Sequence, residues 1–154
     1  MKKSPATRIE ISVRKQRLLL KSGRQTLAEY PVSTSRYGLG SKEGSMKTPT
    51  GRFRVADKIG EGMPIGTIFK SRRPVKPTRK LLQEEDLIMT RILWLDGLEP
   101  RNANTHGRYV YIHGTNREES IGTAASIGCV RMKNADVAEL FELVTVDTPV
   151  VIRP

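Results

Sequence analysis

The sequence predicts a mainly β fold in a single domain, with one helix near the C-terminus. Short segments in which apolar and polar side chains alternate, the pattern of half-buried strands, recur along the chain, and one late segment has helical spacing. The 154 residues fit one domain, since domains usually have about 100–200 residues, and no repeat or linker divides them. We therefore expect residues 1–154 to form one unit.

Strand patterns are clearest where every second residue is apolar. Ile9, Ile11 and Val13 alternate with polar neighbours, and Gly or Pro residues mark the turns between such segments. A Gly/Ser-rich loop at residues 35–45 and a surface excursion through the two prolines of residues 74–77 separate the strands. The expected strands cover residues 8–14, 18–21, 26–33, 52–55, 87–95, 109–113 and 150–152.

The expected helix begins near Asn134, whose side chain can cap its N-terminus. Val137, Leu140, Phe141 and Val144 follow at positions i, i+3, i+4 and i+7 of one face. This spacing predicts that the apolar face packs on the sheet.

Positive charge is concentrated in the first half of the chain. Residues 1–80 carry a net charge of +15 and residues 81–154 carry −4, which together give +11. A positive half attracts anionic partners or serves only as a solvated face. Nucleic acid is not an expected partner, because the basic runs lack interleaved aromatic residues and only 5% of the chain is aromatic.

The residue counts exclude several kinds of site. One cysteine rules out an internal disulfide or cysteine-rich zinc site, and two histidines rule out a three-histidine metal site. No stretch approaches 18 apolar residues, so no membrane span is expected. The basic start at Lys2 and Lys3 lacks the apolar segment of a signal peptide. A cytoplasmic location is expected if this N-terminus is native, and a periplasmic one if an export signal was lost.

The single cysteine, Cys129, is a candidate nucleophile. Gly128 before it permits close backbone approach, and the amides around Cys129 could face the oxyanion that forms when a thiolate attacks a carbonyl. His113 ends an apolar strand, where a loop could bring the cysteine back to it. An adjacent imidazolium would lower the pKa of the thiol from its usual value of about 8.5. The two residues taken alone are also compatible with a buried structural cysteine and a structural histidine.

Two stretches closely resemble the signature of the L,D-transpeptidase (YkuD-type) catalytic domain: Tyr109-Val-Tyr-Ile-His-Gly-Thr115 and Ser126-x-Gly-Cys-x-Arg131. Thr48-Pro-Thr-Gly-Arg-Phe53 and Pro64-Ile-Gly resemble further recurrent segments of that family. The resemblance implies a β-sandwich-like fold and cysteine acyl transfer on peptidoglycan stem peptides. The cysteine would attack the carbonyl of the third residue, usually meso-diaminopimelate, and release the terminal D-Ala. The acyl group would pass to water (L,D-carboxypeptidase) or to an amine (L,D-transpeptidase).

The resemblance also implies a role for each motif residue. Cys129 matches the nucleophile and His113 the base, and the backbone carbonyl of Gly114 would orient the imidazole. Arg131 would hold a substrate carboxylate or brace the cysteine loop. No metal or other cofactor is implied. Carbapenems, which acylate the cysteine of this family, are expected to modify Cys129.

One residue departs from the family pattern, which usually reads Ser-His-Gly-Cys, because Ile127 occupies the second position. This change removes a hydrogen-bonding group and makes the pocket more apolar, but the missing histidine is not the base. The alternative function is a catalytically impaired module that binds peptidoglycan fragments. For an active cytoplasmic member, hydrolysis of recovered stem peptides would be favoured over cross-linking.

Several neighbouring residues have two interpretations each. Ser126 either donates a hydrogen bond near the thiolate and substrate or shapes the turn, and His106 either lines the cleft or is a solvated loop residue. Trp94 belongs either to the core or to a substrate platform. Tyr109 and Tyr111 are expected on one strand face, packed under the site.

Overall fold

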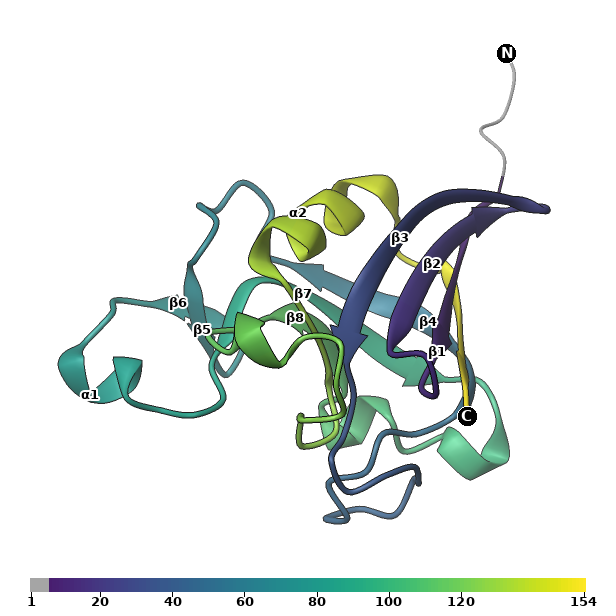
Figure 1. Ribbon diagram of the computed structural model, residues 1–154, viewed down its shortest axis with the longest axis horizontal. Coiled ribbons are helices and arrows are strands. Elements are labelled where there is room, and N and C mark those ends of the chain that lie inside the picture. Colours follow the sequence, from purple (N-terminus) through teal and green to yellow (C-terminus); the bar gives the residue numbers. More distant parts are fainter. Residues whose placement is uncertain (1–5) are drawn as a thin grey trace.

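The computed structural model describes residues 6–154 and confirms the mainly β architecture (Figure 1). Residues 1–5, which include the basic start of the chain, lie outside the described residues. The strands are β1 (Arg8–Ser12), β2 (Arg17–Ser22), β3 (Gln25–Ser33), β4 (Gly51–Ile59), β5 (Ile68–Lys70), β6 (Arg73–Val75), β7 (Ile88–Gly97), β8 (Tyr111–Gly114), β9 (Val130–Met132) and β10 (Pro149–Arg153).

The strands form one sheet that closes on itself. Its order is β4-β10-β1-β2-β3-β9-β8-β7-β5-β6, and a further pairing of β4 with β7 joins the two ends of the first eight strands into a ring. β1 pairs parallel to β10, and β8 pairs parallel to β9, whereas the other pairings are antiparallel. The result is a barrel-like sandwich with a single interior.

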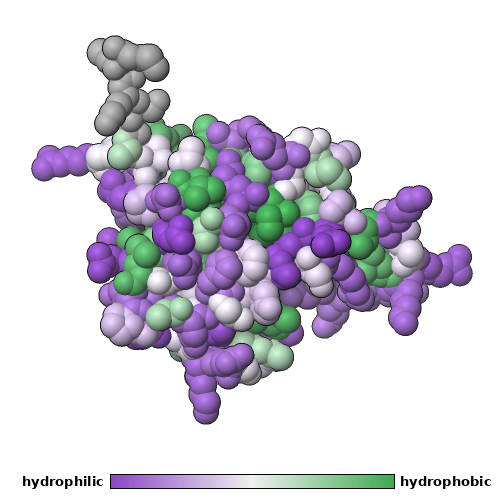
Figure 2. Space-filling model, turned by 180° about the vertical axis from the view of Figure 1, so that it is seen from behind, coloured by the Kyte–Doolittle hydropathy of each residue, from purple (hydrophilic) through white to green (hydrophobic). Residues whose placement is uncertain are grey.

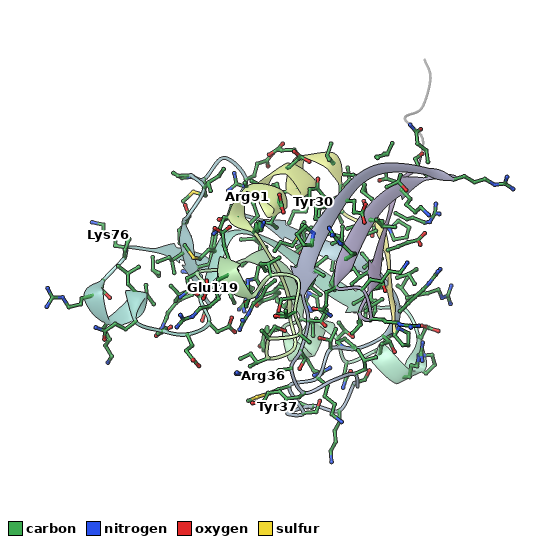
Figure 3. All side chains as sticks on the ribbon, in the orientation of Figure 1. Tyr30, Arg36, Tyr37, Lys76, Arg91 and Glu119 are labelled. Carbon is green, nitrogen blue, oxygen red and sulfur yellow. The ribbon has the colours of Figure 1, made fainter. Side chains whose placement is uncertain are left out.

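The alternating strand residues fill that interior. Ile9 and Ile11 of β1 are almost fully buried, as their spacing predicts, and they belong to one apolar cluster with residues of β2, β3, β4, β7, β8, β9 and β10. Burying such side chains stabilises the fold by roughly 1.5–3 kcal/mol each. Tyr30 of β3 donates a hydrogen bond to Glu139 Oε1 at 2.6 Å and so ties the sheet to the late helix (Figure 3).

The late helix is α2 (Asn134–Leu143), and it packs against β7 and β8 (Figure 1). Val137, Leu140 and Phe141 enter the main core, as predicted. The expectation that Asn134 caps the helix is wrong, because Lys133 is the N-cap residue and makes no side-chain cap bond. Instead the N–H of Asn134 donates to Glu118 Oε2 at 2.7 Å, which places a carboxylate at the positive end of the helix.

The expected surface excursion has a structure of its own, which we call the arm (residues 68–87). It consists of the β5–β6 hairpin and the short helix α1 (Arg79–Leu82), and it projects from the body beside β7 (Figure 1). Ile68, Leu81 and Leu87 form a small separate core inside it. Hydrophilic side chains project from its outer surface, on which the apolar Leu82 is also exposed, and Lys76 points away from the body (Figures 2 and 3).

Three short 3-10 helices complete the described chain: Pro100–Asn102, His106–Arg108 and Glu118–Ser120. Within residues 6–154 no helix is both long and apolar enough to cross a membrane.

Candidate active site

The parallel pairing of β8 with β9 brings Cys129 and His113 together. His113 lies opposite Arg131 in the register, and Cys129 immediately precedes β9, where its Sγ accepts a hydrogen bond from the N–H of Tyr111 at 3.4 Å. Because side chains alternate along a strand, residues 111 and 113 share one sheet face with residues 129 and 131, while Ile112 and Val130 point into the core. Two segments separated in sequence therefore present their polar residues on one face.

His113 is buried and held in one orientation. Its Nδ1–H donates to the backbone oxygen of Gly114, whereas its Nε2 has no hydrogen-bond partner among the described residues. The carbonyl can only accept, so the proton sits on Nδ1 and the lone pair sits on Nε2. Burial lowers the pKa of His113, an effect that the negative charge of Asp86 opposes. The ring is therefore a neutral base with a free lone pair.

Gly114 is required because the backbone there is tightly enclosed. A Cβ at this position would lie 2.6 Å from the backbone oxygen of Met89 and would clash with Oδ1 of Asn134. Asn134 is fixed in turn, because its Nδ2 donates to the backbone oxygen of Thr115 at 2.8 Å. The pattern His-Gly thus reflects packing as well as orientation of the imidazole.

We expect Gly114→Ala to destabilise the fold by about 1–3 kcal/mol, the usual cost of overpacking a closed site. Equilibrium denaturation would measure this cost. Gly107→Ala is the matched control, since nothing lies within 4 Å of a Cβ there, and it should stay within about 0.5 kcal/mol of the parent. If the two variants were equally stable, Asn134 and Met89 would have to move at little energetic cost to accommodate the added Cβ.

The loop before Cys129 is shaped by Ser126. This serine is fully buried, its Oγ donates to the backbone oxygen of Cys129 at 2.6 Å, and it accepts from the N–H of Gly128 at 3.3 Å. Gly128 has φ +129°, a conformation that favours glycine. Ser126 is therefore a turn-shaping residue, and its contact with substrate stays a prediction. An oxyanion role for Gly128 stays a prediction.

Arg131 forms an ion pair with Asp86, at 2.8 Å between Nη2 and Oδ1. The side chain of Arg131 is 6% exposed, so the pair is shielded from water on its arginine side. Asp86 belongs to the arm, and Arg131 therefore braces the arm against β9 and its neighbour β8. Of the two roles considered for Arg131, this geometry supports the brace; contact with a substrate carboxylate stays a prediction.

The thiol of Cys129 is held in its neutral form. Burial raises its pKa to about 11, while the hydrogen bond from Tyr111 and the charges of Arg131 and Arg108 act in the opposite direction. The expected lowering by an imidazolium does not occur, because burial also keeps His113 neutral. The resting pair is thus thiol and imidazole, and a thiolate forms only as the proton moves to Nε2.

We expect alkylation of Cys129 by iodoacetamide to be slow at pH 7 and to rise with pH through a midpoint at about pH 11, where half of the thiol is ionised. The alkylation rate should increase with pH because the thiolate is the reactive form, and it is the minor form at every pH below the raised pKa. Intact-mass measurement of the alkylation rate against pH would test this. A midpoint at or below pH 8.5 would instead show a preformed thiolate–imidazolium pair.

Cys129 opens into a cleft of about 740 Å³. Ile127, 37% exposed, forms part of its wall near Cys129, where it presents an apolar surface. Asp86 and Arg72 reach the cleft from the arm, and Arg108 reaches it from the 3-10 helix before β8. This volume is in the range of small-molecule and peptide sites.

An aromatic group lies beside the cleft. Trp94 is half-buried, and its ring stacks on His106 at 3.9 Å between centroids and meets Tyr111 edge-on at 5.6 Å. His106 also contacts Asp57 Oδ2 at 3.0 Å and is not among the cleft-lining residues, so it supports Trp94 from behind. The expectation that Tyr109 and Tyr111 share a strand face is wrong, because Tyr109 has φ +58° and precedes β8.

Sequence reasoning missed the four charged residues of the cleft, which are Arg72, Asp86, Arg108 and Glu43 of the Gly/Ser-rich loop. Arg72 and Asp86 come from the arm, whose fold gave no periodic signal. Arg108 donates to the backbone oxygens of Lys47 at 2.9 Å and Gly40 at 3.4 Å, and so fastens the Gly/Ser-rich loop beside the nucleophile. Its only sequence signal is its place between His106 and the catalytic strand. Within residues 6–154 no group of three or more His, Cys, Asp or Glu side chains could hold a metal ion.

Comparison with known proteins supports the assignment of this fold. Residues 6–152 match the family description of the YkuD L,D-transpeptidase catalytic domain. YqjB of Bacillus subtilis (strain 168), named as an L,D-transpeptidase, is 54% identical over 48 residues, which are 31% of this chain and 27% of YqjB. The match thus spans about a quarter of that relative's length.

Two solved structures share the fold at low sequence identity. The L,D-transpeptidase from Xylanimonas cellulosilytica DSM 15894 is 20% identical, with a TM-score of 0.63 over 99% of this chain and 63% of that one. The L,D-transpeptidase LdtMt1, solved in complex with imipenem, is 19% identical, with a TM-score of 0.60 over 96% of this chain and 59% of that one. The family match covers nearly all the described residues, and the chain therefore belongs to the YkuD family of L,D-transpeptidase catalytic domains.

Proposed function

We propose that this domain cleaves the L,D bond between the third residue of a peptidoglycan stem peptide, meso-diaminopimelate, and the terminal D-Ala. The observation that carries the proposal is the placement of Cys129 at an open cleft and on the same sheet face as His113, whose buried Nε2 lacks a partner among the described residues. An unpartnered buried lone pair on the same sheet face as a thiol suits a base for a cysteine nucleophile.

The acylation step follows from this arrangement. His113 Nε2 takes the thiol proton of Cys129 as the sulfur attacks the carbonyl carbon, and a C–S bond forms. The carbonyl oxygen becomes an oxyanion that a backbone N–H can stabilise. The N–H of Tyr111, which points at the sulfur, is a candidate donor. The oxyanion then collapses, the C–N bond breaks, and the imidazolium returns its proton to the amine of the departing D-Ala.

The second step releases the acyl group from Cys129. Neutral His113 takes a proton from water or from an acceptor amine as that group attacks the thioester, and the thiol is restored with the returned proton. Water gives a tripeptide, and an amine gives a cross-linked product. The same two residues therefore serve both reactions, and the acceptor decides between them.

Mass spectrometry of a stem tetrapeptide incubated with the protein, with and without an acceptor amine, tests the proposal. Loss of one D-Ala in water supports an L,D-carboxypeptidase, and a product joined to the amine supports an L,D-transpeptidase. An intact substrate in both reactions, with measurable binding, would overturn the enzyme proposal in favour of the binding module. The apolar wall at Ile127 and the raised pKa of Cys129 are also compatible with a binding module that has no catalytic activity.

A further inference from the structure

Arg72 lies over the aromatic group and faces the cleft that holds Cys129. Its guanidinium stands 4.9 Å from the ring centroid of Trp94 and 5.1 Å from that of Tyr109, and its Nη1 donates to the hydroxyl of Tyr111 at 3.2 Å. A guanidinium at this distance from a ring face is attracted by the negative charge of the π-system. Three aromatic side chains from the body thus fix one arginine from the arm.

The turn that carries Arg72 is strained. Ser71 and Arg72 are the two residues between β5 and β6, with φ +48° and +65°. Hairpin turns of this kind strongly prefer Asn-Gly or Gly, so Ser71 and Arg72 are held in an unfavourable backbone conformation. A strained backbone conformation of this kind persists where surrounding contacts stabilise it. In this turn, the contacts of the Arg72 side chain with Trp94, Tyr109 and Tyr111 provide that stabilisation.

The other two arginines near Cys129 are already engaged. Arg131 pairs with Asp86, and Arg108 donates to two backbone oxygens. Within residues 6–154 the ion pairs include none for Arg72, whose one hydrogen-bond acceptor there is the phenol of Tyr111. A guanidinium has five N–H donors in a planar fork that matches a carboxylate. Most of the donors of Arg72 are therefore available to a ligand.

Tyr111 sets the spacing between Arg72 and the nucleophile. Its backbone N–H contacts Cys129 Sγ, and its hydroxyl contacts Arg72, so the two groups are separated by the length of one tyrosine. In a stem peptide the carboxylate of the terminal D-Ala lies next to the scissile bond. The carboxylate of a diaminopimelate side chain lies a full side-chain length from the scissile carbonyl, which is the better fit to this spacing.

We propose that Arg72 binds the side-chain carboxylate of the third stem residue and makes the domain selective for diaminopimelate over lysine. The inference rests on the proposed function for the identity of the substrate. Arg72 acts as a specificity-determining residue, with its fork directed at the carboxylate and its faces packed on Trp94 and Tyr109.

The test compares three variants on three tetrapeptides. Arg72→Gln removes the charge, Arg72→Lys keeps the charge without the planar fork, and Arg73→Gln makes the same charge change at the exposed neighbour. The tetrapeptides carry diaminopimelate, lysine at the third position, or diaminopimelate with the terminal carboxylate amidated. We expect Arg72→Gln to lower kcat/KM about 10- to 100-fold on both diaminopimelate peptides and less than about twofold on the lysine peptide. Arg72→Lys should recover part of the loss, and Arg73→Gln should change none of the rates.

Two patterns would overturn the proposal. An equal loss on the diaminopimelate and lysine peptides would show that Arg72 does not read the side chain of the third residue. A loss that disappears when the terminal D-Ala is amidated would assign Arg72 to that carboxylate instead. Thermal unfolding of Arg72→Gln beside Arg73→Gln shows whether a rate loss comes from unfolding.

Binding measured in the Cys129→Ala background separates this inference from the proposed function. Calorimetry with the diaminopimelate and lysine tetrapeptides requires no turnover. A preference for diaminopimelate that Arg72→Gln removes would support the inference even if the parent proved inactive. Equal affinities for the two peptides would refute it even if the parent released D-Ala.

Discussion

Replacing Cys129 with alanine is expected to abolish both the release of D-Ala from a stem tetrapeptide and covalent capture of a carbapenem. Removing the nucleophile of an acyl-transfer enzyme lowers turnover by on the order of 10⁶-fold, because the remaining groups act only as a unit with it. Cys129 is the single cysteine of the chain, so no other thiol can replace it. Mass spectrometry of the peptide product and of the intact protein after incubation with imipenem measures both effects.

Cys129→Ser is the matched variant, since the side chain keeps its size and can still accept from the N–H of Tyr111. A serine hydroxyl is much less acidic than a thiol, so a neutral base activates it poorly, and this variant should be nearly as inactive as the alanine one. An imipenem adduct that persists in Cys129→Ala would place the reactive group elsewhere and refute the assignment.

Replacing His113 with glutamine is expected to slow acylation of Cys129 by on the order of 10²–10⁴-fold, the usual effect of losing a positioned base. The effect should be large here because the thiol, whose pKa burial raises to about 11, is almost fully protonated at neutral pH. Burial lowers the pKa of His113, so the base of the parent is still mostly neutral at pH 6.5 and becomes protonated only at lower pH, where the acid limb of its pH–rate profile should lie. Stopped-flow acylation by imipenem measures both the rate and the profile.

His106→Gln is the control for this experiment, because His106 is the second of two histidines and supports Trp94 outside the cleft lining. Its acylation rate should stay close to that of the parent. If His113→Gln also kept the parent's rate, another group would have to take the proton, and the carboxylate of Asp86, which lines the cleft, would be the first to test.

The strands and the helix could be predicted because their signals are local. Alternation placed Ile9 and Ile11 in the core, and i, i+3, i+4 spacing did the same for Leu140 and Phe141. The closure of the sheet could not be predicted, since the pairing of β4 with β7 depends on how residues far apart meet. The N-terminus of α2 was misassigned for the same reason. The carboxylate that accepts a hydrogen bond from its backbone belongs to Glu118, which lies in an earlier 3-10 helix.

The candidate site was predicted only as far as its motif extends. Cys129, His113 and Gly114 stand in one recognisable pattern, and the structure places them on β8 or beside β9. The pattern could not decide between roles for Ser126, since this depends on burial. Arg72 could not be identified as a cleft residue because it lies in a basic run. The sequence does not show which arginine of such a run makes contacts and which is solvated.

The position of β10 has a consequence for how the protein is made. β10 lies between β4 and β1, so an interior strand of the ring is the last one to leave the ribosome. Until then the nascent domain has two open strand edges that cannot yet meet, and exposed edges are templates for pairing with other chains. The ring is thus completed after translation of the domain ends, and a chain stalled before residue 149 lacks the strand that would join β1 to β4.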